Sequence, residues 1–370
     1  MPGKAPRSSK NRPKNGISYD LMRSEIVWRD RQKMLEQHGY LLRPRFRPGW
    51  EPSWLKTNKD PLLCEDSLFN PVPKLIDAIR ISDGMKVVIK AVRRDSTETS
   101  IGIFLSSPDL AKDPRNHCVP ILDVIRDESA PNLEFLVMPL LRPFNKPPFF
   151  SVDEMLDFMK QVLEGLVFMH SVGVAHRDCS DMNIMFDGAG MYPNGFHASV
   201  WNLDERGIPT YPRRRRDVQS VRYYFTDFGL SSRFLDGEPH VVTGMSGLDK
   251  EVPELQLPLN RYDPFPVDVF ILGNVFKNNF TAKFSNASFL IPVVESMTQK
   301  KASERPSSAE ALAHFERLVS SVPGYKRRWR LKETGKGRLG SFIQDVGSLG
   351  RECYYILGSL LRSARRSESE

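Results

Sequence analysis

The sequence predicts an α+β protein in which a small β-rich part precedes a larger, mainly helical part. Two observations lead to this prediction. Between residues 70 and 141 the apolar residues lie in short β-rich runs that are separated by turns. Between residues 142 and 322 they recur mainly at helical spacing, and two of the runs begin with a capping pattern. At 370 residues the chain is long enough for two packed lobes and for flanking segments besides.

The positive charge of the chain lies in its flanks. Residues 1–16 hold five basic residues and no acid, and residues 326–338 hold seven basic residues and one acid. Together these stretches carry more positive charge than the +8 of the whole chain, so the remainder is mildly acidic. Because a nucleic-acid-binding domain carries its positive charge on its own face, we expect no specific nucleic-acid binding. Residues 1–16 are predicted to be a disordered basic arm, and residues 323–370 a basic tail.

The cysteines and the apolar segments predict the cellular location. The four cysteines are widely spaced, which indicates neither a zinc site nor a disulfide framework and favours a reducing compartment. The sequence has no secretory signal and no run of the roughly 18 apolar residues that span a membrane. We therefore expect a cytoplasmic or nuclear protein, and a monomer. Apolar residues within 341–366 are compatible with an amphipathic helix on a membrane, but docking onto the protein itself is more common, so membrane contact is not expected.

Residues 17–69 are predicted to form a helix followed by a strap. Apolar residues recur at helical spacing from Tyr19 to about Gln37, and Gly39 supplies a stop. The next segment, Leu41–Trp54, is rich in proline and contains two tryptophans. Proline at this density excludes regular helix and central strand, so we expect an extended strap that holds aromatic rings on a lobe surface. A peptide-binding role for the strap is the alternative.

The β-rich part, residues 70–141, is predicted to contain a hairpin and two further strands. The hairpin covers Ile79–Val92, with Asp83-Gly84 as its turn. The other strands are expected at Val119–Ile125 and Leu133–Leu140, which completes a small sheet.

The helical part, residues 142–322, contains four predicted helices. The first and the last begin with a Ser-x-x-Glu capping box, at Ser151 and at Ser307. The four helices are expected at about 151–170, 266–276, 289–297 and 307–319.

A long insert, at about 188–221, interrupts this helical part. It lies within the 44 residues that separate Asn183 from Asp227, and a structureless loop of that length is usually functional or disordered. The insert contains the basic run Arg213–Arg216. Two interpretations of this run stay open: it binds an acidic partner or serves as a nuclear address, or it is simply solvated.

Four motifs carry the chemistry. Val87-Val-Ile-Lys90 places a lysine at the end of an apolar run, and Glu98 follows on a helical face. His176-Arg-Asp-Cys-Ser-Asp-Met-Asn183 holds an acid, Asp178, and a carboxamide, Asn183, and Asp227-Phe-Gly229 follows a β-rich run. Each motif alone occurs in unrelated proteins. In this order they resemble the eukaryotic-type protein kinase family over roughly residues 70–320, and the overall pattern is similar to uncharacterised fungal kinase-like proteins.

The resemblance implies a bilobal protein-kinase-like fold, with a small β-rich N-lobe and a larger, mainly helical C-lobe. It also implies ATP and Mg²⁺ as cofactors and a protein as substrate. Lys90, positioned by Glu98, would hold the α- and β-phosphates of ATP. Asn183 and Asp227 would bind Mg²⁺. Asp178 would be the base that accepts the proton of a substrate hydroxyl. Serine or threonine is the expected substrate residue, and the sequence leaves tyrosine open as the alternative.

Further roles follow from the same resemblance. Arg177 would offer its guanidinium to a phosphorylated activation loop, for which Thr243 and Ser246 are the candidate sites. Met138 would guard the back of the nucleotide pocket, and Leu140 would lie in the hinge between the lobes. His176 and Phe228 would join the lobes as spine residues.

Three later features extend the resemblance. Val252-Pro-Glu254 resembles the end of a kinase activation segment, and Asp268 would lie in the helix beneath the catalytic loop. Arg305 would pair with Glu254. These features support a platform for a peptide substrate and count against the alternative of a small-molecule phosphotransferase of related fold.

Two departures from the family pattern concern the phosphates. No Gly-x-Gly-x-x-Gly precedes Lys90, and Ser180 stands where a serine/threonine kinase usually carries a lysine. The first should weaken nucleotide binding, and the second removes a positive charge near the transferred phosphate. The main alternative is therefore a pseudokinase, a scaffold or binding module of the same fold with weak or no transfer.

Overall fold

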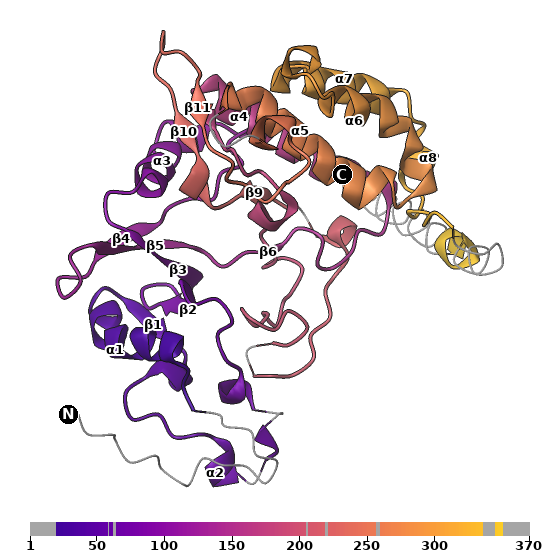
Figure 1. The fold of residues 1–370 in the computed structure, drawn as a ribbon. Helices are drawn as coiled ribbons and strands as arrows, with labels where there is room; N and C mark the ends of the chain where they lie inside the picture. Colours follow the sequence, from indigo (N-terminus) through magenta and orange to yellow (C-terminus); the bar gives the residue numbers. More distant parts are fainter. Residues whose placement is uncertain are drawn as a thin grey trace, which may run out of the picture. The chain divides into compact units, whose positions relative to one another are not determined.

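The computed structural model shows a mixed α and β protein with an antiparallel sheet (Figure 1). The residues that it describes are 20–57, 59–61, 64–204, 206–218, 221–256, 260–335 and 345–350. The chain divides into two compact units. Unit 1 consists of Met1–Thr99, Pro120–Arg142 and Gly188–Arg213, and unit 2 of Ser100–Val119, Pro143–Asp187 and Arg214–Glu370.

Unit 1 contains a five-stranded antiparallel sheet in the order β1-β2-β3-β5-β4. Its strands are β1 (Tyr40–Leu42), β2 (Leu75–Arg80), β3 (Lys86–Arg93), β4 (Asp123–Arg126) and β5 (Leu133–Pro139). The predicted hairpin is confirmed as β2 and β3, and Gly84 in its turn has a φ of +73°. The strand predicted at Val119–Ile125 begins only at Asp123, because Pro120 has no N–H to donate to a ladder.

Helix α1 (Arg23–Gln37) packs on this sheet and completes the core of unit 1. Trp28 and Leu35, on one face of the helix, are buried, as the helical spacing predicts. They belong to one cluster with strand residues that include Ile76, Val87, Ile89, Phe135 and Val137. Gly39, with a φ of +86°, lies just beyond the helix end, where a stop was predicted. Tyr19, where the predicted helix starts, lies outside the described residues.

The Leu41–Trp54 segment differs from the extended strap that its prolines predict. Its first residues complete β1, which is an edge strand, and Pro44–Phe46 form a 3-10 turn. Trp54 opens a short helix, α2 (Trp54–Thr57). Its ring lies 6.1 Å from that of Trp50, and both pack with Cys64. An edge strand and a single helical turn tolerate nearby prolines because neither needs every backbone N–H.

A buried ion pair ties this segment to α1. The Arg45 guanidinium lies 3.0 Å from the Glu25 carboxylate, and the two side chains are 1% and 0% exposed. Glu25 also accepts hydrogen bonds from the backbone N–H groups of Met22 and Asn70. Helix α1, the turn after β1 and the residues before β2 therefore share one buried carboxylate.

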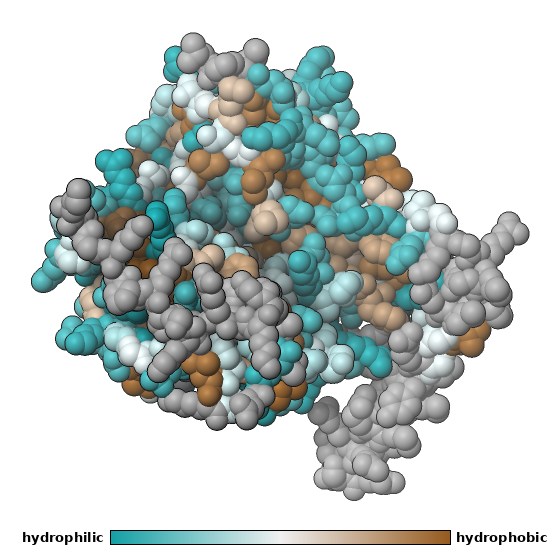
Figure 2. Space-filling model, turned by 60° about the horizontal axis from the view of Figure 1, so that its bottom comes forward, coloured by the Kyte–Doolittle hydropathy of each residue, from teal (hydrophilic) through white to brown (hydrophobic). Residues whose placement is uncertain are grey.

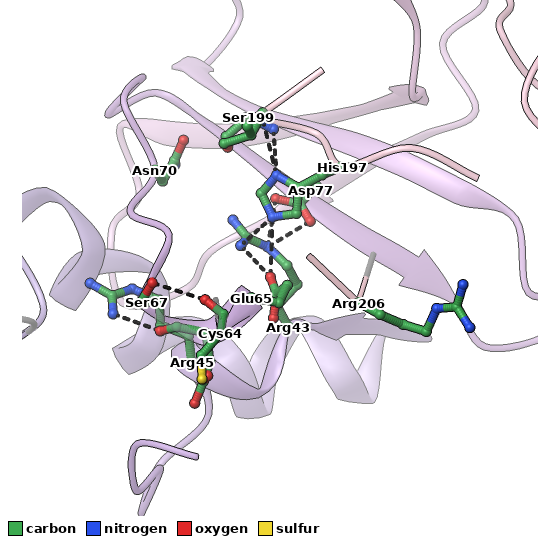
Figure 3. Close-up of polar contacts among 12 residues, drawn as sticks. Arg43, Arg45, Cys64, Glu65, Ser67, Asn70, Asp77, His197, Ser199 and Arg206 are labelled. Carbon is green, nitrogen blue, oxygen red and sulfur yellow. Dashed lines mark hydrogen bonds and ion pairs between the residues drawn. The ribbon is translucent and has the colours of Figure 1, made fainter. Parts of the chain in front are cut away.

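A second arginine, Arg43, attaches the insert to the rest of unit 1 (Figure 3). Its guanidinium lies 2.7 Å from Glu65 and 2.8 Å from Asp77. In the insert, the Nε2 of His197 lies 3.2 Å from the same Glu65 carboxylate, and its Nδ1 accepts from the backbone N–H of Ser199. This part of the insert is therefore held by polar contacts and is not a structureless loop.

Unit 2 is mainly helical, and its four predicted helices are found with ends shifted by two residues at most. Ser151 and Ser307 accept the backbone N–H groups of Glu154 and Glu310, as predicted. The reciprocal bond of a capping box forms at Ser307, whereas the Glu154 carboxylate accepts from the N–H of Phe150 and not from that of Ser151. The helices beyond α2 are α3 (Thr97–Leu105), α4 (Val152–Ser171), α5 (Pro264–Phe276), α6 (Ile291–Met297), α7 (Ser308–Ser320) and α8 (Gly324–Arg327).

Short strand pairs in unit 2 shape the loops between these helices. β7 pairs with β10, β8 with β9, and β11 with β12, each antiparallel. The remaining strands are β6 (Arg142–Pro143), β7 (Val174–Ala175), β8 (Ile184–Phe186), β9 (Tyr223–Phe225), β10 (Ser232–Arg233), β11 (Val242–Thr243) and β12 (Arg261–Tyr262). Single 3-10 turns include Glu65–Ser67, Asp181–Asn183, Phe228–Leu230 and Pro253–Gln256.

Arg215 of the predicted basic run is buried rather than solvated. Its guanidinium donates to the backbone carbonyls of Phe144, Pro147 and Pro148 at 2.8–3.1 Å. Arg213 and Arg214 are exposed. An acidic partner stays a prediction for this run, and Arg215 is not available to it.

The structure adds two observations on membrane contact. No helix among the described residues is long and apolar enough to cross a bilayer. On the face shown in Figure 2, hydrophobic residues are interspersed with hydrophilic ones. Within the predicted amphipathic segment 341–366, only residues 345–350 are described, and they are helical.

We predict that Glu25→Gln lowers the free energy of unfolding by about 3–5 kcal/mol, because it removes the negative charge from the buried Glu25–Arg45 ion pair. Urea unfolding followed by circular dichroism measures this change. Asp109→Asn is the control, since it breaks the Lys112–Asp109 pair, whose side chains are 76% and 95% exposed. The control should change the free energy by about 0.5 kcal/mol or less. Equal losses in both variants would contradict the role of the buried pair.

Glu25 should also make the protein sensitive to acid. Burial raises its pKa, but hydrogen bonds from Arg45, Met22 and Asn70 outweigh burial, so the pKa lies below the usual value of 4.5. A carboxyl with a pKa lowered by folding stabilises the protein above its unfolded pKa, and this contribution is lost as the pH falls through the folded pKa. We predict that stability declines below pH 4.5 and that the decline is smaller in Glu25→Gln. Parallel curves of unfolding free energy against pH would refute this.

Candidate active site

Unit 1 brings Lys90 and Glu98 together. Lys90 lies in β3, the central strand of the sheet, and Glu98 lies in the first turn of α3. The Lys90 Nζ lies 2.5 Å from the Glu98 Oε1, and the side chains are only 14% and 12% exposed. The ion pair holds the ammonium in one place, whereas an exposed lysine would sample many positions. The contact expected from the motif order is present, and its role in phosphate binding stays a prediction.

Strand alternation places Met138 beside Lys90. Ile89 points into the core under α1, so the adjacent Lys90 points to the opposite face of the sheet. Val88 lies two residues from Lys90, and it pairs with Met138 in the register of β3 and β5. Met138 therefore shares the face of Lys90. Leu140 follows β5 directly, and its N–H bonds to the backbone of β3 at 3.1 Å.

In unit 2, the pairing of β8 with β9 brings Asn183 and Asp227 to one end of this pair of strands. Asn183 immediately precedes β8, and Asp227 follows β9 by two residues. Because Ile184 pairs with Phe225, Thr226 reaches Asn183 and donates its N–H to the Asn183 carbonyl at 2.9 Å. Asp227 then adopts a φ of +64°, a left-handed conformation that turns the chain directly after the strand.

The Asp178 carboxylate accepts one N–H on each oxygen. Its Oδ2 accepts from Asn183 Nδ2 at 2.9 Å, and its Oδ1 accepts from the backbone N–H of Leu248 at 2.8 Å. Burial raises the pKa of Asp178 above the usual value of 3.8, although these two hydrogen bonds oppose the rise. A carboxylate with a raised pKa is a better proton acceptor than an ordinary aspartate, which suits a general base.

Asp268 of α5 holds the backbone of the loop that carries Asp178. Its fully buried carboxylate accepts from the N–H of His176 at 2.7 Å and from that of Arg177 at 2.6 Å. It also lies 3.2 Å from the Nε2 of His170. Arg177 has a φ of +67°, which residues other than glycine rarely adopt, so the bonds to Asp268 stabilise a strained turn.

The Arg177 side chain binds the segment that follows Asp227. Its guanidinium donates to the Leu230 carbonyl and the Ser232 hydroxyl, each at 3.2 Å. It also donates to the Thr243 carbonyl at 2.9 Å and to the Tyr262 hydroxyl at 3.2 Å. These acceptors are neutral oxygens. Binding of a phosphorylated residue by Arg177 stays a prediction.

His176 is a neutral link between the two motifs of unit 2. Burial lowers its pKa, so the ring carries no charge near neutral pH. Its Nδ1 accepts from the backbone N–H of Asp178 at 3.3 Å, which leaves Nε2 to donate to the Thr226 carbonyl at 3.1 Å. The ring centroid lies 5.4 Å from that of Phe228, so the two expected spine residues contact each other within unit 2.

Two further residues of unit 2 bear on the sequence predictions. Arg305, with a fully buried side chain, lies 2.8 Å from Glu254, as the motif order predicts. The Ser180 hydroxyl is buried and has no hydrogen-bond partner among the described residues. Ser180 therefore supplies no contact that would replace a lysine at this position.

The oxygen atoms of Asn183 and Asp227 fit Mg²⁺. Asn183 uses its Nδ2 for the carboxylate and the backbone carbonyl of Asp178, which leaves its Oδ1 as the atom able to ligate a cation. In the part of the chain that is described, no group of three or more His, Cys, Asp or Glu side chains could hold a metal ion. Mg²⁺ matches such a site because it binds through few protein groups, together with phosphate oxygens and water.

Sequence reasoning missed the Leu248 amide as part of this site. The only signal for it is the pair of glycines before it, Gly244 and Gly247, whose φ values are +113° and +143°. Closely spaced glycines indicate backbone turns. They do not indicate which side chain the next N–H meets.

The similarity to known proteins is limited in extent. No family model matches the chain. Over 123 residues it is 32% identical to "Probable serine/threonine-protein kinase KKQ8" of Candida glabrata. This stretch covers 32% of the present chain and 12% of that protein. The similarity indicates a kinase-like relationship over a short stretch, and it does not extend to the activity of the whole relative.

We predict that Asp268→Ala lowers the free energy of unfolding by about 2–6 kcal/mol. The substitution leaves the N–H groups of His176 and Arg177 without acceptors, and each unsatisfied buried group costs about 1–3 kcal/mol. Guanidinium chloride unfolding measures the loss. Asp236→Ala is the control in the same unit, because Asp236 is exposed, and it should change the value by about 0.5 kcal/mol or less. A loss no larger than that of the control would show that Asp268 does not hold the loop.

Proposed function

We propose that the protein is a Mg²⁺-dependent protein kinase that transfers the γ-phosphate of ATP to serine or threonine hydroxyls of protein substrates. The observation that carries the proposal is the arrangement of Asp178, Asn183 and Asp227 at one end of the β8–β9 pair. The short similarity to a protein named as a serine/threonine kinase supports it. The proposal includes a bilobal kinase fold, with lobes at 70–141 and 142–322, and a cytoplasmic or nuclear location.

Each residue has one role in the proposed transfer. Asp178, whose two oxygens each accept an N–H, would take the proton of the attacking hydroxyl. Asn183 and Asp227 would hold Mg²⁺, which neutralises charge on the phosphates. Lys90, held by its 2.5 Å contact with Glu98, would bind the α- and β-phosphates.

The nucleotide base would be bound by residues of β5 and of the segment after it. Met138 is 8% exposed and lies on the same face of the sheet as Lys90. Leu140 lies just beyond the strand, and its N–H is bonded to β3. These positions would provide an apolar surface and an ordered backbone for an adenine ring.

A pseudokinase is the second candidate, and two observations on phosphate handling favour it. The buried Ser180 hydroxyl makes no contact with another described residue that would restore a missing cation. β1 and β2 are joined by residues 43–74 and not by a short glycine-rich turn. Loss of one electrostatic contact in a transition state costs about 10²–10³ in rate. For the first candidate, the kinase, the missing contact therefore predicts slow phosphate transfer.

Binding and transfer should respond differently to two substitutions. Mg·ATP binding is measured by thermal stabilisation, and transfer by labelling of casein with radioactive γ-phosphate. Asp178→Asn should keep binding and lose about 10²–10⁴ in transfer rate, because a general base contributes that factor. Asp227→Ala should lose transfer and also weaken Mg·ATP binding, because it removes a Mg²⁺ ligand. The exposed Asp236→Ala serves as the matched control and should behave as the wild type does.

The wild-type results separate the candidates. Stabilisation by Mg·ATP without any transfer would identify a pseudokinase. Absence of both would refute nucleotide binding altogether. Equal transfer in the wild type and Asp178→Asn would refute the assignment of the base while leaving ATP binding intact.

A further inference from the structure

We propose that the backbone N–H of Leu248 positions the Asp178 carboxylate for proton transfer, at a place where Ser180 offers no cation. The inference rests on the proposed phosphotransfer function and adds a positioning residue to it. The observation behind it is the 2.8 Å hydrogen bond from the Leu248 N–H to Asp178 Oδ1, between residues that lie 70 positions apart. The Leu248 side chain is 55% exposed, so the amide rather than the side chain makes this contact.

The contact acts together with Asn183 to set the orientation of the carboxylate. Asn183 Nδ2 donates to the other oxygen at 2.9 Å. Two donors on different oxygens prevent rotation of the carboxylate, whereas a single donor leaves the second oxygen free to move. Because an ionised carboxylate has about four acceptor sites, these two bonds leave room for a substrate hydroxyl. The two hydrogen bonds therefore orient the Asp178 carboxylate without preventing it from accepting a proton.

Gly247 allows the backbone to approach Asp178. Its φ of +143° is a conformation that side-chain-bearing residues rarely adopt, so the path of the backbone here favours glycine, although a Cβ would meet its neighbours only at ordinary van der Waals distances. Hydrogen bonds hold the segment on both sides of the contact. Arg177 donates to the Thr243 carbonyl at 2.9 Å, and Asn274 donates to the Asp249 carboxylate at 2.8 Å. The amide is therefore held in place by the fold and does not depend on a bound ligand.

The direct test replaces Leu248 by its α-hydroxy analogue, which exchanges the N–H for an ester oxygen and keeps the side chain. We expect kcat to fall about 10- to 100-fold, since small misplacements of a catalytic group have effects of this size. The KM for Mg·ATP should change less than about twofold, because Asp178 does not bind the nucleotide. A purely structural defect would alter both constants and the melting temperature.

Two comparisons isolate the missing N–H. The ester also makes the Gly247 carbonyl a weaker hydrogen-bond acceptor. This carbonyl accepts a hydrogen bond from Lys250 Nζ at 2.7 Å. Lys250→Met removes that bond alone, and its kcat should stay within about threefold of the wild type. Leu248→Pro and Leu248→Ala repeat the test with ordinary residues, since only proline lacks the N–H. We expect kcat of the proline variant to lie at least about tenfold below that of the alanine variant.

The outcomes separate this inference from the proposed function. If the ester variant has the same kcat as Lys250→Met, the inference is overturned. If the kcat of the ester variant is higher than that of the wild type, the Leu248 contact inhibits transfer, and the inference is overturned as well. A wild type without transfer would refute the proposed function. In that case, the rate of hydrogen exchange of the Leu248 amide would test whether the hydrogen bond to Asp178 exists. Faster exchange in Asp178→Ala than in the wild type would confirm a structural contact only, and equal exchange would refute the contact.

Discussion

The buried carboxylate of Asp268 is the group on which the candidate active site depends. It accepts the N–H groups of His176 and Arg177, and it does so from α5, a helix 91 residues further along the chain. Burial of a charge is costly unless hydrogen bonds compensate for it, and here the loop backbone supplies them. The strained turn at Arg177 then sets the orientation of the next residue, Asp178, in the loop. Asn183 and Leu248 can orient Asp178 only because its backbone is already fixed.

In unit 1, two arginines hold separate parts of the chain together, and only Arg45 of the two is fully buried. Arg45 joins α1 to the turn after β1, and Arg43 joins that turn to the insert through Glu65 and His197. Both arginines come from a segment that is too rich in proline to form long regular elements. Charge-assisted hydrogen bonds therefore connect parts of the chain that hydrogen-bond ladders cannot reach. These contacts hold the segment that follows β1, the edge strand of the sheet that carries Lys90.

Local patterns predicted the elements that local forces determine. The helix caps at Ser151 and Ser307 and the alternation that places Lys90 opposite the core act over a few residues, so they are visible in the sequence. The prolines of Leu41–Trp54 do not predict the 3-10 turn at Pro44–Phe46 or the helix that begins at Trp54, because proline excludes long elements and not single turns. The attachment of the insert was missed as well, since His197 reaches Glu65 across 132 positions and leaves no periodic signal.

The sequence alone predicted the order of the motifs, a protein of mixed α and β structure, and residues of the types that bind phosphate and Mg²⁺ in other proteins. It did so because helix caps, strand alternation and motif spacing depend on neighbours within a few positions. The folded path of the chain establishes which backbone N–H holds Asp178, and it places Arg215 against carbonyls of its own chain. Those contacts join residues about 70 positions apart. They depend on the path of the backbone through turns such as Gly247, which residue identity alone does not specify.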